Sequence, residues 1–147
     1  MAFNILLVDD SETMRAVIRR VVEMSGVPVD EFHEAGNGFE ALDVLKDNWI
    51  DVILSDINMP EMGGMELLVE VKRNEVTGSI PVIFITTEAS DAKMAEAKRL
   101  GVSGYIKKPF VPEGIKAVLL EVLEKAYDHK PISDAEIAEA SDDDMDF

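Results

Sequence analysis

The sequence predicts a single α/β domain with a five-stranded, parallel, doubly wound sheet and five helices, followed by a short acidic C-terminal tail. Three short runs are almost wholly apolar and rich in β-branched residues, as expected of parallel strands covered on both faces: FNILLV (3–8), DVILS (51–55) and PVIFI (81–85). Between and after these runs, apolar residues recur with the spacing of a helix. The strand–helix order repeats five times, which predicts right-handed crossover connections.

The first and last helices have the clearest patterns. Apolar residues of the first helix lie on one face, at Met14, Val17, Ile18, Val21 and Val22. Gly26, followed by Pro28, is a typical end for this helix. The last helix follows Pro112, a residue tolerated in a first helical turn, and its apolar face holds Ile115, Val118, Leu119, Val122, Leu123 and Ala126. Both segments are therefore predicted to be amphipathic helices.

The remaining elements have weaker signals. They are expected at 29–34 (strand), 38–47 (helix), shortly after Gly63-Gly64 (helix), 91–99 (helix) and 103–107 (strand). The charges in VDEFHE favour an edge strand, and Ser90 can be the N-cap of the fourth helix. Because the apolar face of that helix is mostly Ala and Met, it should bury little area and be the least firmly held of the five.

Composition limits the classes of function. The chain has 147 residues, 47% of them hydrophobic, which is enough for one domain with a packed core. It has no cysteine, so disulfides and thiolate metal sites are excluded and a hard cation is favoured over zinc. No run approaches the roughly 18 apolar residues of a membrane helix, and the amino terminus does not resemble a signal peptide. We expect a cytoplasmic protein that does not bind a membrane.

The charge is large, negative and unevenly distributed. There are 30 acidic and 14 basic residues, a formal charge of −16, which argues against nucleic-acid binding because phosphates would be repelled. Residues 128–147 hold eight acidic residues and one Lys, a net charge of −7, so residues 1–127 carry −9. We therefore divide the chain into a folded domain over 1–127 and an acidic tail over 128–147.

Polar side chains stand at the ends of four of the predicted strands. They are Asp9 and Asp10 after the first, Asp56 after the third, Thr86 after the fourth and Lys108 after the fifth. The carboxyl ends of parallel strands meet at the edge of the sheet where open α/β folds bind ligands. Each residue alone has an ordinary structural explanation, such as a helix cap or a solvated surface Lys, but the joint placement favours a site for a cation and a phosphoryl group.

The chemistry of such a site follows from these residue types. Clustered carboxylates repel one another, and Mg²⁺ prefers oxygen ligands of this kind. With that charge compensated, Asp56 becomes a plausible nucleophile toward phosphorus, and Lys108 and Thr86 can bind phosphoryl oxygens. Lys108-Pro109 is also a candidate cis peptide bond, since such bonds occur almost always before proline.

The motifs around these residues resemble those of a known family. LLVDDSETMR, ILSDINMPEMGG, ITTEA and GYIKKPF occur in this order, and over about residues 3–126 the chain resembles the receiver domain of two-component response regulators, especially the stand-alone chemotaxis regulators of the CheY type. CheY is itself a standard example of the strand order 2-1-3-4-5, so the resemblance implies that order here.

The resemblance also implies roles for individual residues. Asp56 would be the phospho-acceptor, and Mg²⁺ would be held by Asp10, Asp56 and the main-chain carbonyl of Asn58, with Asp9 assisting through water. Thr86 and Lys108 would bind the phosphoryl group. Tyr105 would be a switch residue that turns inward when Thr86 moves toward the phosphate.

The partners implied are a sensor histidine kinase, as phosphoryl donor, and an output protein such as a flagellar switch component, bound by the face of the fourth helix, fifth strand and fifth helix. The tail has two possible roles. It can be a disordered solubilising segment, or it can dock on the output face of its own or a neighbouring molecule through Ile132, Ile137, Met145 and Phe147. In favour of docking, Ser133 to Glu136 reads as a helix capping box.

Two other classes of protein share part of this pattern. A phosphohydrolase of the haloacid dehalogenase kind also forms an aspartyl phosphate, but its signature needs a second Asp two residues after the nucleophile, where this chain has Asn58. A flavin-binding flavodoxin-like module is disfavoured because two acids, rather than a phosphate-binding loop rich in Ser, Thr and Gly, follow the first strand.

Overall fold

The computed structural model describes residues 2–87 and 90–127, and the predicted tail (128–147) lies outside them. The elements in chain order are β1 (Phe3–Val8), α1 (Glu12–Ser25), β2 (Val29–Ala35), α2 (Gly38–Asp47), β3 (Val52–Ser55), α3 (Gly64–Arg73), β4 (Val82–Thr86), α4 (Asp91–Leu100), β5 (Gly104–Lys107) and α5 (Pro112–Tyr127). The predicted alternation of five strands and five helices is confirmed, with boundaries that differ by a residue or two.

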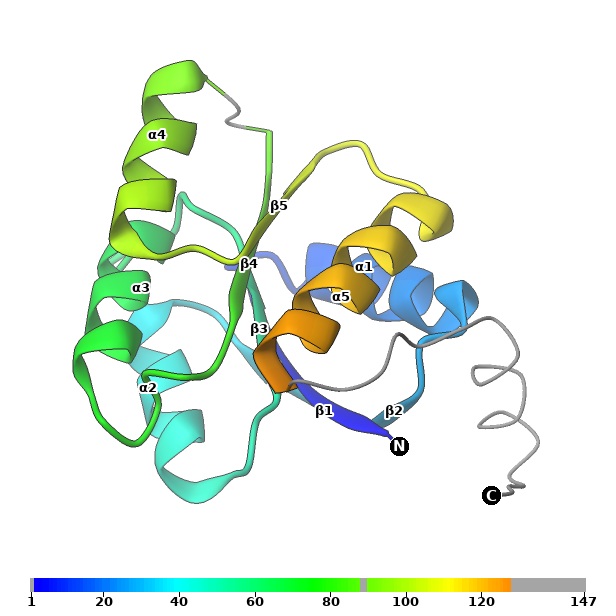
Figure 1. The fold of residues 1–147 in the computed structure, drawn as a ribbon, viewed down its shortest axis with the longest axis horizontal. Helices are drawn as coiled ribbons and strands as arrows, with labels where there is room; N and C mark the ends of the chain where they lie inside the picture. Colours follow the sequence, from blue (N-terminus) through cyan, green and yellow to red (C-terminus); the bar gives the residue numbers. More distant parts are fainter. Residues whose placement is uncertain (1, 88–89, 128–147) are drawn as a thin grey trace.

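The strands form one sheet in the order β2-β1-β3-β4-β5, and every neighbouring pair is parallel. This confirms the predicted doubly wound topology. Helices α1 and α5 cover one face of the sheet, and α2, α3 and α4 cover the other (Figure 1).

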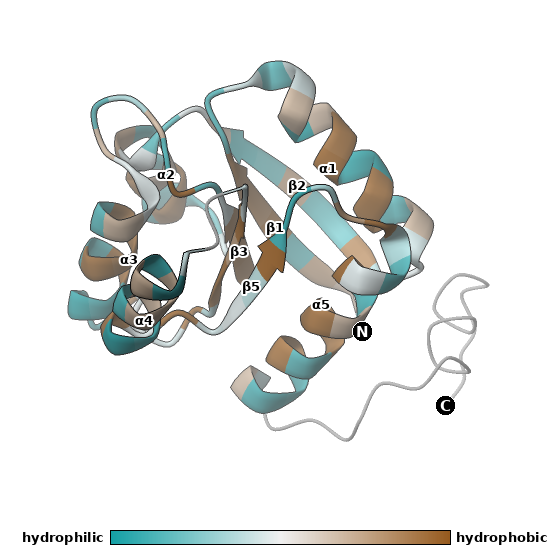
Figure 2. Ribbon diagram, turned by 90° about the horizontal axis from the view of Figure 1, so that it is seen from above, coloured by the Kyte–Doolittle hydropathy of each residue, from teal (hydrophilic) through white to brown (hydrophobic). Residues whose placement is uncertain are grey.

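Each face of the sheet has its own hydrophobic core. Alternate residues of the inner strands point to opposite sides, so Ile5 and Leu7 pack toward α1 and α5, whereas Leu6 and Val8 pack toward α2 and α3. The inner strands are largely hydrophobic and the edge strand β2 is more hydrophilic (Figure 2). The charged segment VDEFHE, predicted to be an edge strand, is therefore part of β2 at one edge of the sheet.

Two predicted helix ends are confirmed, the N-cap at Ser90 and the end of α1 at Gly26, and the structure adds caps at two further helices. Ser11, Asn37 and Ser90 are the N-caps of α1, α2 and α4, and each side chain accepts a hydrogen bond from a backbone N–H in the first turn. Gly26 ends α1 with φ 87°, a left-handed conformation that glycine adopts without strain. Of the ten residues of α4, Ala97 alone is buried, in agreement with the expectation that this helix is weakly held.

Candidate functional site

Four of the predicted site residues, Asp9, Asp10, Asp56 and Lys108, lie together at the carboxyl edge of the sheet. The parallel hydrogen-bond ladder continues past the strand ends, because the backbone N–H of Asp9 donates to Ala35 O (3.0 Å), that of Asp56 to Val8 O (2.9 Å) and that of Lys108 to Thr86 O (2.9 Å). These three bonds fix the backbone of the residues that carry the polar groups. The sheet therefore fixes the positions of the Cα atoms from which these three side chains extend.

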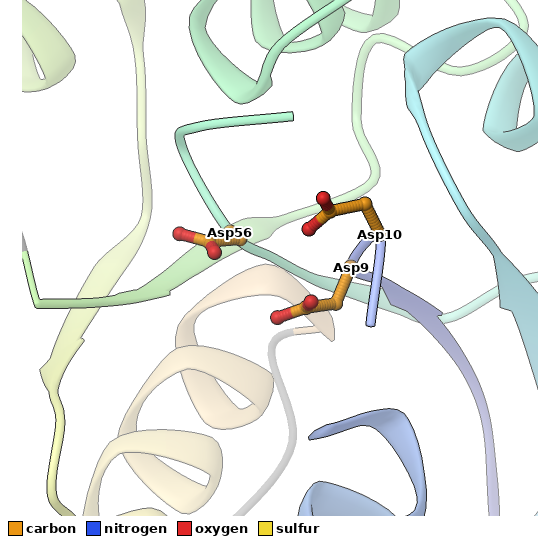
Figure 3. Close-up of side chains that lie close together, drawn as sticks. All are labelled: Asp9, Asp10 and Asp56. Carbon is orange, nitrogen blue, oxygen red and sulfur yellow. The ribbon is translucent and has the colours of Figure 1, made fainter. Parts of the chain in front are cut away.

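Three carboxylates gather at the ends of β1 and β3 (Figure 3). Asp9, Asp10 and Asp56 each offer one oxygen, and these oxygens lie within 4.8 Å of one another. Asp9 is buried, Asp56 is half-buried and Asp10 is exposed, so the cluster opens to solvent on one side. Like charges this close are unfavourable unless a cation compensates them.

Lys108 supplies one such cation. Its Nζ lies 3.4 Å from Asp9 Oδ2 and 3.5 Å from Asp56 Oδ2, and its side chain is 14% exposed. One ammonium thus bridges two of the three carboxylates. The peptide bond between Lys108 and Pro109 is cis, in agreement with the sequence-based expectation.

Local hydrogen bonds orient two of the acids. Asp9 Oδ1 accepts from the backbone N–H of Ser11 (2.9 Å), and Asp56 Oδ1 accepts from the backbone N–H of Ile57 (2.7 Å). In both residues it is the other oxygen, Oδ2, that faces Lys108. The two carboxylates therefore have defined orientations before any ligand arrives.

The acidic cluster fits a hard divalent cation. Mg²⁺ prefers oxygen ligands, keeps several waters and is commonly held by one or two carboxylates together with phosphate oxygens. A half-open edge with three carboxylates suits that pattern better than a closed cage would. Asn58, the other predicted ligand, is exposed in the loop two residues after Asp56.

Thr86 and Tyr105 lie on one face of neighbouring strands. Thr86 is buried as the last residue of β4, and Phe84, two residues before it, pairs in register with Tyr105 of β5. The Tyr105 ring is half-buried and packs edge-on against Phe84, with 6.4 Å between centroids and an interplanar angle of 87°. Both predicted switch residues therefore face the side of the sheet covered by α3 and α4.

Sequence reasoning missed how tightly the loop after Asp56 is folded. A Cβ at Gly64 would lie 2.3 Å from Asp56 O, and a Cβ at Gly38 would lie 2.4 Å from Met62 Cγ. The Gly38 N–H also donates to Met62 O (2.9 Å), which joins this loop to the start of α2. The paired glycines 63 and 64 in the sequence were the available signal, but the contact with α2 has no sequence signature.

Sequence reasoning also missed Arg15, whose guanidinium donates to the main-chain oxygen of Asp9 (2.6 Å) and to Glu34 (2.8 Å).

Within residues 2–87 and 90–127, no helix has the length and apolar character needed to cross a membrane.

Comparison with known proteins places these features in a family. The family model for the response regulator receiver domain matches residues 5–120. A chemotaxis protein CheY homologue of Campylobacter jejuni is 41% identical over 121 residues, which cover 82% of this chain and 92% of the relative. Chemotaxis protein CheY1 of Helicobacter pylori is 40% identical over 121 residues, covering 82% of this chain and 96% of that protein.

Solved structures agree with these sequence matches. The chemotaxis protein CheY4 of Vibrio cholerae superposes with a TM-score of 0.75 at 34% identity, covering 83% of this chain and 99% of the other. A CheY-like receiver domain protein from Methanospirillum hungatei superposes with a TM-score of 0.76 at 25% identity, covering 87% and 98%. The family match at residues 5–120 ends before the acidic tail begins.

Proposed function

Because this chain belongs to the response regulator receiver domain family, a family of signalling switches rather than of enzymes that turn over foreign substrates, we propose that it accepts a phosphoryl group on Asp56 and thereby changes its affinity for a partner protein. A two-component receiver implies a sensor histidine kinase as phosphoryl donor. The observation that carries the proposal is the bridge of Lys108 between Asp9 and Asp56, within a cluster of three carboxylates.

The transfer step uses these residues as follows. A carboxylate oxygen of Asp56 attacks the phosphorus atom of a phosphohistidine, the P–N bond breaks, and the imidazole leaves with the electron pair of that bond. Lys108 moves from carboxylates to phosphoryl oxygens, and the hydroxyl of Thr86 donates to another oxygen. Asp10, Asp56 and the carbonyl of Asn58 would hold Mg²⁺, with Asp9 assisting through water, and the bound cation would neutralise charge on the transferred group.

Phosphorylation of Asp56 would be transmitted to Tyr105 through Thr86, the last residue of β4. Movement of Thr86 toward the phosphate would leave space beside Phe84, into which the half-buried Tyr105 ring can turn further. Such a switch shifts a two-state equilibrium only by the difference in interaction energy between the states, about 1–3 kcal/mol in typical cases. The weak burial of α4 supports a low cost of rearrangement on this side.

The output surface would be the face formed by α4, β5 and α5. Residues 91–127 hold seven basic and five acidic residues, a net charge of +2, whereas residues 1–90 hold six basic and 17 acidic residues, a net charge of −11. This charge separation supports an acidic or amphipathic partner on that face. The named relatives are chemotaxis proteins, so a flagellar switch component in the cytoplasm is the partner we propose.

The acidic tail has a net charge of −7, opposite in sign to that of residues 91–127, so it would compete with an acidic partner for this face. The test compares partner affinity of the full chain with that of a version ending at Asp128, in both phosphorylation states. Competition by the tail requires the shortened version to bind more tightly, and equal affinities would exclude it.

Intact mass spectrometry tests the phospho-acceptor proposal. Wild type incubated with acetyl phosphate and Mg²⁺ should gain the mass of one phosphoryl group, and the gain should disappear with excess EDTA. Asp56→Asn should gain nothing under either condition, while Asp30→Asn, which changes an exposed acid on β2, should behave as wild type. An equal adduct on Asp56→Asn would contradict the proposal.

A further inference from the structure

We propose that Arg15 is a positioning residue for the cation site, because its guanidinium holds the turn that carries Asp9 and Asp10 against β2 and so sets the affinity for Mg²⁺. This inference rests on the proposed function of the site. Arg15 does not belong to the acidic cluster itself, and its charge has the same sign as that of the cation. Support of Mg²⁺ binding by Arg15 would therefore have to come from geometry rather than from its charge.

The contacts of Arg15 join three parts of the fold. Its Nη1 donates to the main-chain oxygen of Asp9 at 2.6 Å, and its Nε donates to Glu34 Oε1 at 2.8 Å. Arg15 lies near the start of α1, Asp9 follows β1, and Glu34 belongs to the edge strand β2. The Arg15 side chain is 16% exposed and that of Glu34 is 35% exposed, so this pair is shielded more than an ordinary surface ion pair.

With Arg15 in place, Asp9 is held at both of its backbone polar groups and at its side chain. Its N–H donates to Ala35 O (3.0 Å), its carbonyl oxygen accepts from Arg15, and its Oδ1 accepts from the N–H of Ser11 (2.9 Å). Asp10 is the next residue, and its side chain is exposed. The position of its Cα atom, from which the carboxylate extends, therefore depends on the peptide between Asp9 and Asp10. Loss of the Arg15 bond would free that peptide.

Arginine is suited to this position in a way that lysine is not. The planar guanidinium presents several N–H donors in a fixed arrangement, so it can donate to Asp9 and Glu34 at the same time and in set directions. A lysine ammonium would keep the charge but not the paired geometry. Arg15→Lys therefore separates the effect of the positive charge from the effect of the paired hydrogen bonds.

Charge and geometry predict opposite effects on Mg²⁺ binding. If Arg15 acts on the site through its positive charge alone, removing it should tighten the binding of a divalent cation. If Arg15 orients the turn, removing it should weaken binding, because loss of hydrogen-bonding partners that orient metal ligands typically costs about 10–100-fold in metal affinity. The sign of the change decides between the two.

The experiment is calorimetric titration of the full chain with Mg²⁺ alone, with no phosphoryl donor. We expect the Kd of Arg15→Met to rise about tenfold or more, that of Arg15→Lys to remain raised, and Glu34→Gln, which keeps an acceptor for Nε, to show a smaller rise. Arg19→Met is the matched control, since Arg19 lies one turn further along α1, contacts Glu34 (3.9 Å) and stacks over Phe32 (4.9 Å). Its Kd should change by less than about twofold.

Circular dichroism and the urea midpoint in EDTA establish that each variant is folded. Equal or tighter Mg²⁺ binding by folded Arg15→Met overturns the positioning role. If that variant does not fold, the same criterion applies to Arg15→Lys, whose Mg²⁺ affinity must be weaker than that of wild type. Absence of Mg²⁺ binding by wild type would refute the proposed metal site, and this inference with it, whereas normal wild-type binding with no effect of Arg15 refutes this inference alone.

Discussion

Replacing Asp10 by Asn removes one of three clustered negative charges while nearly preserving the size of the side chain. The oxygens of the cluster lie within 4.8 Å of one another, and Lys108 contacts Asp9 and Asp56. At 4.8 Å, the upper limit of that separation, a pair of charges repels by about 3.5 kcal/mol at an effective dielectric constant of about 20, and by about 0.9 kcal/mol in bulk water. Because Asp10 is exposed, we expect Asp10→Asn to stabilise the metal-free protein by about 1–2 kcal/mol.

The same substitution should weaken stabilisation by Mg²⁺. At a Mg²⁺ concentration about 100 times its Kd, a ligand that binds only the folded state stabilises it by about 2.7 kcal/mol, and a tenfold weaker affinity reduces this to about 1.4 kcal/mol. Wild type should therefore be the less stable protein in EDTA and should gain more from Mg²⁺. This result would indicate that Asp10 is retained for Mg²⁺ binding although it lowers the stability of the metal-free protein.

Urea denaturation of wild type, Asp10→Asn and the control Asp30→Asn, each in EDTA and in excess Mg²⁺, measures both effects. Asp30 is an exposed acid on β2, outside the cluster, so its replacement should change neither quantity by more than about 0.5 kcal/mol. The reasoning is refuted if Asp10→Asn is less stable than wild type in EDTA, or if Mg²⁺ stabilises it as much as wild type.

Three further predictions follow from other contacts of the structure. Lys108→Met should destabilise the metal-free protein by about 3 kcal/mol, because it leaves partly buried carboxylates without their counter-charge, and Mg²⁺ should restore part of the loss in the same urea assay. Gly64→Ala should cost about 3 kcal/mol and slow phosphorylation by acetyl phosphate, since a Cβ there would lie 2.3 Å from Asp56 O; unchanged values would show that the loop can adjust. Tyr127 donates to the main-chain oxygen of Asp51, and burial, with a smaller contribution from the Asp51 carboxylate, raises the pKa of Tyr127 from 10.0 to about 12. The folded state therefore keeps a proton that the unfolded chain loses, so stability should fall between about pH 10 and 12, and Tyr127→Phe should lose about 1 kcal/mol at neutral pH together with that part of the pH dependence.

The topology was predictable because local patterns were consistent with it. Apolar strands alternate with amphipathic helices, and the caps at Ser11, Asn37 and Ser90 agree with that alternation. The cluster of Asp9, Asp10 and Asp56 was predictable for a related reason, since parallel strands bring their carboxyl ends to one edge whatever the details of packing.

The long-range side-chain contacts of the domain were not predictable, either at the site or away from it. Arg15 reaches Asp9 and Glu34 from a helix whose pattern reports only its buried face, and Tyr127 reaches Asp51 across 76 residues of sequence. Such bonds depend on side-chain rotamers and on how the helices pack against the sheet, and no periodic pattern in the sequence indicates them. The tail beyond Tyr127 was interpreted from composition and motif resemblance alone.

The central claim is that Asp56, rather than either neighbouring acid, carries the phosphoryl group. Borohydride reduces an aspartyl phosphate to homoserine and so marks the modified residue permanently. After treatment with acetyl phosphate and Mg²⁺, reduction and digestion, tandem mass spectrometry should find homoserine at position 56 and unmodified Asp at positions 9 and 10. Homoserine at position 9 or 10, or at none of the three, would contradict the account.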